Sequence, residues 1–152
     1  MAYLAIGAFA GLRHAELMRL EWQDVKLSQG HIEVTAAKAK TAQRRIVPLS
    51  DNLVQWLYPR SSKTGALFTG HPTRFLGKVT KVASVCAFAW IQNGLRHSFA
   101  SYRLAVCKSA AEVALEMGNS PRIVFEHYRE LVTSADAASW WKITPRPHKH
   151  GE

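Results

Sequence analysis

Four short segments hold side chains that could act together on a phosphate group. Arg13 stands directly after a glycine in GLRHAELMRLEW, and Arg96 lies in NGLRHSFASY. Lys40 belongs to the basic stretch AKAKTAQRR, and Tyr128 lies in EHYREL. A guanidinium donates pairs of hydrogen bonds to an oxyanion, an ammonium can supply a proton, and an activated phenol is a nucleophile. If the fold brings them together, side chains of these types are suited to chemistry at a phosphate.

Each of these residues also has an ordinary structural interpretation when it is taken alone. Arg13 can pair with a glutamate one turn later on its own helix, and Arg96 can pair at the surface with the neighbouring histidine. Tyr128 stands at helical spacing from apolar residues, which is also typical of a core tyrosine. Lys40 can be a solvated charge, and Lys38 is the alternative candidate for a lysine that supplies a proton. Only the joint occurrence favours the functional interpretation.

The charge balance favours a polyanionic partner. There are 20 Lys and Arg against 11 Asp and Glu, a formal net charge of +9, so nucleic acid is the first candidate. A basic surface that serves only solubility is the alternative. The sequence has no GxxxxGK[ST], GxGxxG, HExxH or GxSxG motif, and its seven His show no metal-ligand spacing. We therefore expect no cofactor and no metal.

The four segments, in this order and at this spacing, resemble the catalytic domain of the tyrosine recombinase, or phage integrase, family. The pattern runs GLR-x-x-EL-x-x-L-x-W-x-DV, KT in a hairpin, LRHSFA, a glycine-containing helix break and HYR, over residues 8–131. By this resemblance Arg13 and Arg96 match the two catalytic arginines, Lys40 the hairpin lysine and Tyr128 the nucleophile.

The resemblance implies a DNA strand transferase that serves the integration or excision of a mobile element. Tyr128 would attack one phosphodiester, two guanidiniums would stabilise the charge on its oxygens, and the lysine would protonate the leaving 5′ oxygen. The 3′-phosphotyrosine retains the bond energy, so rejoining needs neither ATP nor metal. The implied partner is double-stranded DNA. The protein is expected to be a homo-tetramer on DNA and a monomer when isolated. The side chains expected to contact DNA are Lys38, Arg44, Arg45, His97 and His127.

Two catalytic positions depart from the family pattern. Asn93 stands where the family usually has histidine, three residues before the second arginine, and Asn119 stands where it usually has histidine or tryptophan. An amide can donate a hydrogen bond to a phosphate oxygen but does not take a proton from a phenol at neutral pH. His97 and His127 are candidate substitutes for the base. The alternative function is a catalytically impaired DNA-binding remnant of an integrase, and a topoisomerase-like nicking enzyme is a third hypothesis.

The resemblance also implies the fold that positions these residues: α+β, mainly α-helical, with a small antiparallel β-hairpin, which is the DNA breaking-rejoining enzyme fold. Alternating polar and apolar residues predict a hairpin over residues 30–49. Apolar spacing and capping residues predict helices over the initial apolar run and over 14–22, 51–58, 72–85, 94–106, 110–117, 121–131 and 134–141. Caps are expected from Ser50 and from a box formed by Ser109 and Glu112. Glu16 and Asp24 match family residues that orient the first arginine and its helix.

We expect a single catalytic domain over residues 1–145 and a basic flexible tail over 146–152. The abrupt apolar start predicts an N-terminal truncation, with the family's core-binding domain absent. Cys86 and Cys107 are isolated, which is typical of reduced, buried thiols, and no signal peptide or membrane span is apparent. The expected location is the cytoplasm, at the nucleoid.

Overall fold

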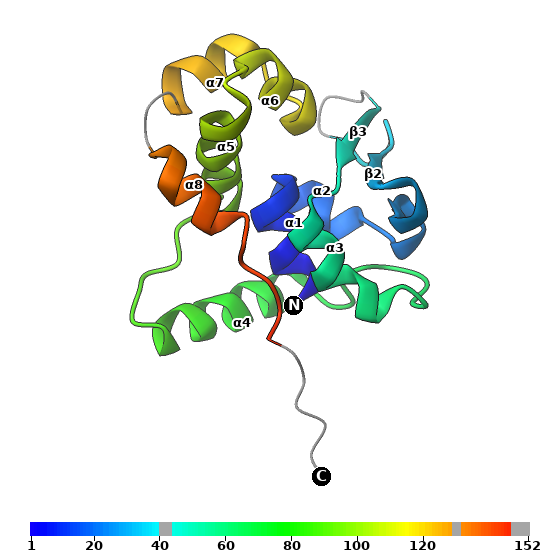
Figure 1. Cartoon of the computed structure of the whole chain (residues 1–152). Coiled ribbons are helices and arrows are strands. Elements are labelled where there is room, and N and C mark those ends of the chain that lie inside the picture. Colours follow the sequence, from blue (N-terminus) through cyan, green and yellow to red (C-terminus); the bar gives the residue numbers. More distant parts are fainter. Residues whose placement is uncertain (40–43, 129–131, 147–152) are drawn as a thin grey trace.

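The described chain is mainly helical with one small antiparallel sheet, which confirms the predicted fold class (Figure 1). The structure, a computed structural model, describes residues 1–39, 44–128 and 132–146. Its helices are α1 (Ala2–Ala10), α2 (His14–Arg19), α3 (Asp51–Leu57), α4 (Pro72–Val85), α5 (Gly94–Cys107), α6 (Ala110–Met117), α7 (Pro121–Tyr128) and α8 (Ser134–Trp140). Its strands are β1 (Val25–Lys26), β2 (His31–Val34) and β3 (Arg45–Pro48), and short 3-10 turns cover Trp22–Asp24, Leu27–Gln29 and Tyr58–Arg60.

The central helix is α1, which is apolar on all sides and therefore suited to full burial. It packs against α2, α3 and α5, and Ile6 and Ala10 have no exposed surface. Gly11 ends the helix in the left-handed region, with φ 62. A Cβ at Gly11 would lie 2.3 Å from the Phe99 ring, so only glycine fits this turn. The turn delivers Arg13 to the start of α2.

The three-stranded sheet positions Arg45 in the interior. β2 pairs with β1 and with β3, all antiparallel, and Val34 lies opposite Arg45. Ile32 and Val47 are fully buried on the face that meets the core. Side chains alternate along a strand, so Arg45 shares the inward face of Val47. β3 also contacts α6, which places the Arg45 guanidinium between the sheet and that helix.

Helices α5, α6 and α7 pack together and form a second apolar cluster. Phe99, Val113, Met117, Val124 and Tyr128 are buried in it. Figure 1 shows α6 and α7 beside each other at one end of α5. The cluster therefore brings the C-terminal end of α7, with Tyr128, against α5.

Trp140, the last residue of α8, and Trp141, which follows it, dock this helix onto α5. Trp140 stacks on Tyr102, with ring centroids 4.4 Å apart and planes 8° apart. Trp141 meets the Phe99 ring edge-on at 6.1 Å. Helix α8 is thus packed on α5 of the same chain through its aromatic side chains.

Several local predictions need correction. β1 was not predicted, because two residues carry too little periodicity to be recognised. Ser50 does not cap α3; its hydroxyl donates to Asn52 instead. Ser109 does accept from the Glu112 backbone, but the Glu112 carboxylate binds Arg103 and does not close a capping box.

One thiol differs from expectation, and three predicted features lie outside the described residues. Cys86 is exposed, contrary to expectation, whereas Cys107 is half-buried. Lys40, the end of the predicted helix over 121–131 and the tail from residue 147 onward lie outside the described residues.

Candidate active site

Arg13 is held at the end of α6 by several oxygens. Its Nη2 donates to the Gly118 carbonyl at 2.6 Å and to Oδ1 of Asn119 at 2.7 Å. Its Nη1 donates to the Met117 carbonyl at 3.4 Å and to Oε1 of Glu16 at 3.2 Å. Because the side chain keeps 19% of its surface exposed, the guanidinium is both oriented and reachable from solvent.

Arg96 approaches the same end of α6 from the first turn of α5. Its Nη1 donates to the Gly11 carbonyl, and its Nη2 donates to the Met117 carbonyl at 2.9 Å. Burial, with the positive charge of Arg13 nearby, lowers the pKa of Arg96 to about 10. The guanidinium still carries its charge at neutral pH. Arg13 and Arg96 are neighbouring positive charges that water screens only in part. An anion that binds between them is therefore electrostatically favoured.

A buried carboxylate holds the two sides of the site together. Glu16 has no exposed surface, and both of its oxygens accept from Arg45, at 3.0 and 2.6 Å. The same carboxylate accepts from the Arg13 backbone at 2.9 Å and from the Arg13 side chain. Burial alone would raise the pKa of Glu16, but the hydrogen bonds and charges of Arg45 and Arg13 outweigh it and lower the pKa. Glu16 therefore orients Arg13, as the sequence predicted.

The Tyr128 phenol points at a histidine. Its Oη lies 2.8 Å from Nδ1 of His97, and the two ring centroids are 5.7 Å apart. Burial raises the pKa of the Tyr128 phenol, and the positive charge of Arg96 opposes that shift. Tyr128 and Arg96 are thus electrostatic neighbours, and the phenol is neutral at physiological pH.

The two asparagines that depart from the family pattern lie in different surroundings. Asn119 accepts from Arg13 and so belongs to the cluster at the end of α6. Asn93 is exposed and precedes α5 in the left-handed region, with φ 58, and its side chain makes no capping hydrogen bond. Within the described residues, Asn93 is not hydrogen-bonded through its side chain to the arginines or to Tyr128. The structure thus groups Asn119, but not Asn93, with the catalytic candidates.

Lys38 and Arg44, which were expected to contact DNA, have carboxylate partners. Lys38 donates to Asp24 at 2.6 Å and to Glu21 at 2.9 Å. Asp24 therefore orients Lys38, whereas the sequence predicted that it orients Arg13. Arg44 pairs with Glu33 at 2.7 Å on the exposed face of the sheet.

The remaining candidates divide between interior and surface. Arg45 is buried, and its guanidinium is occupied by Glu16 and by the Glu116 carbonyl at 3.0 Å, so its role is internal. His127 is exposed at the end of α7, with its ring edge toward Tyr128 at 6.4 Å between centroids. His97 is exposed as well but is engaged with Tyr128.

Sequence reasoning missed the backbone oxygens that orient the arginines. The carbonyls of Gly11, Met117 and Gly118 accept from Arg13 or Arg96. Gly118 is left-handed, with φ 66, and a Cβ there would lie 3.2 Å from Arg45 and 3.4 Å from Arg13. The glycines of GLR and MGNS were visible signals, because a glycine at a helix end marks a special backbone conformation.

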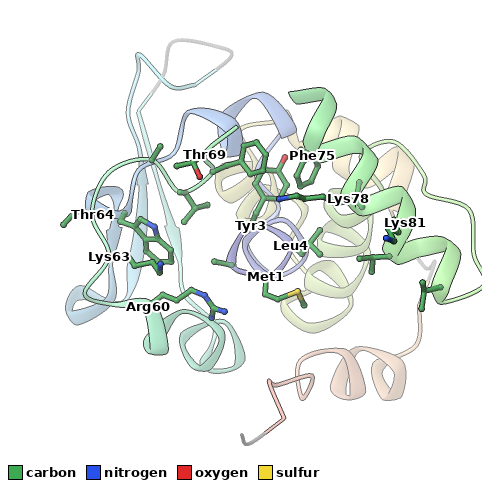
Figure 2. A pocket seen from close by; sticks show the side chains of 18 of the residues that line it. Met1, Tyr3, Leu4, Arg60, Lys63, Thr64, Thr69, Phe75, Lys78 and Lys81 are labelled. Atoms are coloured by element: carbon green, nitrogen blue, oxygen red, sulfur yellow. The ribbon is translucent and has the colours of Figure 1, made fainter. Parts of the chain in front are cut away.

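One cavity lies away from this site. It measures about 880 Å³ and opens between the N-terminal residues and α4, with Tyr3 and Phe75 in its wall and Arg60, Lys63, Lys78 and Lys81 around it (Figure 2). Among the residues that the structure describes, none of the predicted catalytic residues lines it. A second cavity of about 530 Å³ is bordered by Asn93 and Arg96.

Two other kinds of functional feature are absent from the described residues. These residues contain no group of three or more His, Cys, Asp or Glu that could hold a metal ion. None of the described helices is long and apolar enough to cross a membrane.

Sequence comparison finds one family model and one phage relative. A model described as "Phage integrase family" matches residues 2–106, which include Arg13, Asn93 and Arg96 and end before Asn119 and Tyr128. The Integrase of Shigella phage Sf6 is 23% identical over 150 residues, covering 88% of this chain and 38% of that protein.

Solved recombinases share the fold. XerA recombinase superposes with a TM-score of 0.71 at 22% identity, covering 95% of this chain and 56% of that one. XerH site-specific recombinase, bound to its difH substrate, gives 0.65 at 23% identity, covering 94% of this chain and 46% of that one. This chain therefore spans about half of these structures and less of the phage relative.

Proposed function

Because this chain belongs to the phage integrase family, we propose that it is the catalytic part of a site-specific DNA recombinase whose nucleophile is Tyr128. The observation that carries the proposal is the convergence of three groups. Arg13 and Arg96 both donate to the Met117 carbonyl, and Arg96 is close enough to Tyr128 for its charge to oppose the rise in the pKa of the phenol. A phosphate seated there would find two cations beside a tyrosine.

The reaction proceeds by nucleophilic substitution at phosphorus. The Tyr128 oxygen forms a bond to phosphorus, the bond from phosphorus to the 5′ oxygen breaks, and the 5′ oxygen leaves with a proton. Arg13 and Arg96 stabilise the charge that develops on the non-bridging oxygens. Lys40 is our candidate for the acid that protonates the leaving oxygen, by resemblance to the family's hairpin lysine. Attack by a second 5′ hydroxyl on the phosphotyrosine rejoins the strand.

The proposed partner is double-stranded DNA. The excess of basic residues favours this partner, and XerH, which shares the fold, is described in complex with its difH substrate. Of the predicted DNA contacts we retain Lys38, Arg44 and His127. We leave out Arg45, which is buried against Glu16, and His97, which is engaged with Tyr128. We further propose that the working form is a tetramer on DNA in the cytoplasm, at the nucleoid. Residues 1–145 form the catalytic domain.

Covalent trapping on DNA tests this function without knowledge of the target site. The probe is a pool of duplexes that carry a nick a few bases from a randomised segment, so that cleavage releases a short fragment and prevents rejoining. We expect a protein–DNA band that survives SDS and is absent in Tyr128→Phe. Sequencing of the trapped DNA would identify the preferred site. Absence of any trapped product with the intact chain would contradict the proposal.

The second candidate is a DNA-binding module without catalysis. Asn119 favours it, because this amide accepts from Arg13 and cannot take a proton from a phenol at neutral pH. The same pool separates the two functions. A mobility shift that weakens steeply with salt, without any SDS-resistant band, supports the binding module.

A further inference from the structure

The side chain that faces the Tyr128 phenol is the only histidine of the LRHSFA segment. Nδ1 of His97 lies 2.8 Å from the Tyr128 oxygen, within the range for direct proton transfer. The neighbouring Arg96 on the same helix turns inward to the carbonyls of Gly11 and Met117. Consecutive residues of a helix point about 100° apart, so His97 is directed away from the buried arginine and toward α7.

The two positions at which the family usually has histidine offer no base here. Asn119 uses its side-chain oxygen to accept from Arg13, and Asn93 is exposed with no side-chain hydrogen bond to Tyr128 among the described residues. The Tyr128 phenol is nevertheless neutral and buried, so its proton must move before or during attack. An imidazole is the side chain best suited to accept a proton near neutral pH.

We propose that His97 is the general base that takes the proton of Tyr128 during DNA cleavage. The inference rests on the proposed function of Tyr128 as nucleophile. The phenol proton passes to Nδ1 of His97 as the tyrosine oxygen bonds to phosphorus, and the 5′ oxygen leaves with a proton from a separate acid. This step requires neutral imidazole with its hydrogen on Nε2. His97 is exposed, so the proton that it receives can pass to water.

A merely structural hydrogen bond is the competing interpretation, because a buried tyrosine hydroxyl usually has a partner. The two interpretations differ in what a proton acceptor added from solution can do. In His97→Ala, free imidazole that enters the space left by the side chain can accept the phenol proton, so it should restore the cleavage rate if His97 is the base. If His97 serves only as a structural contact, free imidazole should not restore that rate. A glutamine at position 97 can accept the hydrogen bond but not the proton.

The experiment measures the initial rate of covalent trapping on the nicked duplex pool, with the intact chain and three variants. His97→Ala and His97→Gln should each slow trapping by about 10²- to 10⁴-fold while leaving DNA affinity within a few fold. Added imidazole should accelerate His97→Ala, in proportion to its concentration, and leave the intact chain unchanged. His31→Ala, in β2, is the matched histidine control and should trap like the intact chain. Thermal melting establishes that each variant is folded.

The outcomes separate the two proposals. If the intact chain traps DNA and His97→Gln traps it equally fast, His97 is not the base, although the function of Tyr128 stands. Failure of imidazole to accelerate a folded but slow His97→Ala also overturns the assignment. If the intact chain traps no DNA, both proposals fall.

One measurement is independent of cleavage. Nitrogen NMR of the imidazole should find Nδ1 of His97 unprotonated and Nε2 protonated, and the Nδ1 signal should shift in Tyr128→Phe. A hydrogen on Nδ1 in the free protein at neutral pH would contradict the proposed direction of proton transfer.

Discussion

Arg13 and Arg96 donate to the same backbone oxygen, the carbonyl of Met117, at 3.4 and 2.9 Å. One arginine comes from the start of α2 and the other from the first turn of α5, so the last residue of α6 joins two distant parts of the chain. The shared acceptor fixes the spacing of the two guanidiniums before any substrate binds. Such preorganisation is how fixed donors stabilise a transition state without reorganisation at the moment of reaction.

Replacement of either arginine by lysine should impair cleavage more than DNA binding. Lysine keeps the charge but loses the planar pair of donors. We expect Arg13→Lys and Arg96→Lys each to slow covalent trapping by about 10²- to 10³-fold. Arg122→Lys is the control, because Arg122 lies on α7 with Tyr128 but is exposed and pairs with Glu126 one turn along the helix. Equal rates for Arg13→Lys and Arg122→Lys would contradict the assigned role.

Replacement of Glu16 should destabilise the fold. In Glu16→Gln the buried Arg45 and the partly buried Arg13 lose their shared counter-charge, and we expect the free energy of unfolding to fall by about 3 kcal/mol. Glu33→Gln removes the same charge from an exposed pair with Arg44 and should change it by less than about 1 kcal/mol. Urea unfolding followed by circular dichroism measures both. Similar losses in the two variants would show that the buried pair is not special.

Stability should also depend on acid pH through Glu16. Its pKa in the folded chain is lowered from the ordinary value of 4.5, so its contribution is fully present above about pH 4.5. Below that pH the unfolded chain takes up a proton that the folded chain still excludes, and the free energy of unfolding falls as pH falls. Urea titrations between pH 7 and pH 3 should give a shallower loss for Glu16→Gln than for the intact chain. An unchanged slope would count against the carboxylate's role.

The backbone at Gly118 should matter for reasons beyond strain. Alanine there would adopt φ 66, which costs about 1 to 2 kcal/mol, and would press on Arg45 and Arg13 at 3.2 and 3.4 Å. Gly30→Ala is a matched control, because Gly30 has φ 71 and nothing within 4 Å of the added carbon. We expect both variants to lose comparable stability, but only Gly118→Ala to lose covalent trapping, by at least about tenfold. Loss of trapping in both would indicate strain alone.

Much of this architecture could be predicted from the sequence because its signals are local. Apolar spacing and the glycines after α1 and α6 predict where these helices lie and where they stop, and alternation predicts β2 and β3. The same alternation distinguishes Arg45 from Arg44: Arg45 shares the inward face of Val47, whereas Arg44 lies on the outer face. Reading that alternation through the basic residues would have moved Arg45 from the DNA surface to the interior.

The remaining features depend on contacts between distant segments. Whether His97 or His127 faces the Tyr128 oxygen is decided by how α7 packs on α5, which no local pattern contains. The pairing of Lys38 with Asp24 depends likewise on how the hairpin lies against the turn before β1. The hydrogen bonds that the Met117 carbonyl accepts from Arg13 and Arg96 could not be predicted from the sequence, because every residue has a backbone carbonyl.

The most direct test of the account is to identify the residue that becomes linked to DNA. The trapped complex is digested with protease and nuclease, and tandem mass spectrometry locates the nucleotide adduct on the peptide. We predict a 3′-phosphate linked to the oxygen of Tyr128, with the same peptide unmodified in Tyr128→Phe. An adduct on Tyr3, Tyr58 or Tyr102, or trapping that survives in Tyr128→Phe, would contradict the central claim.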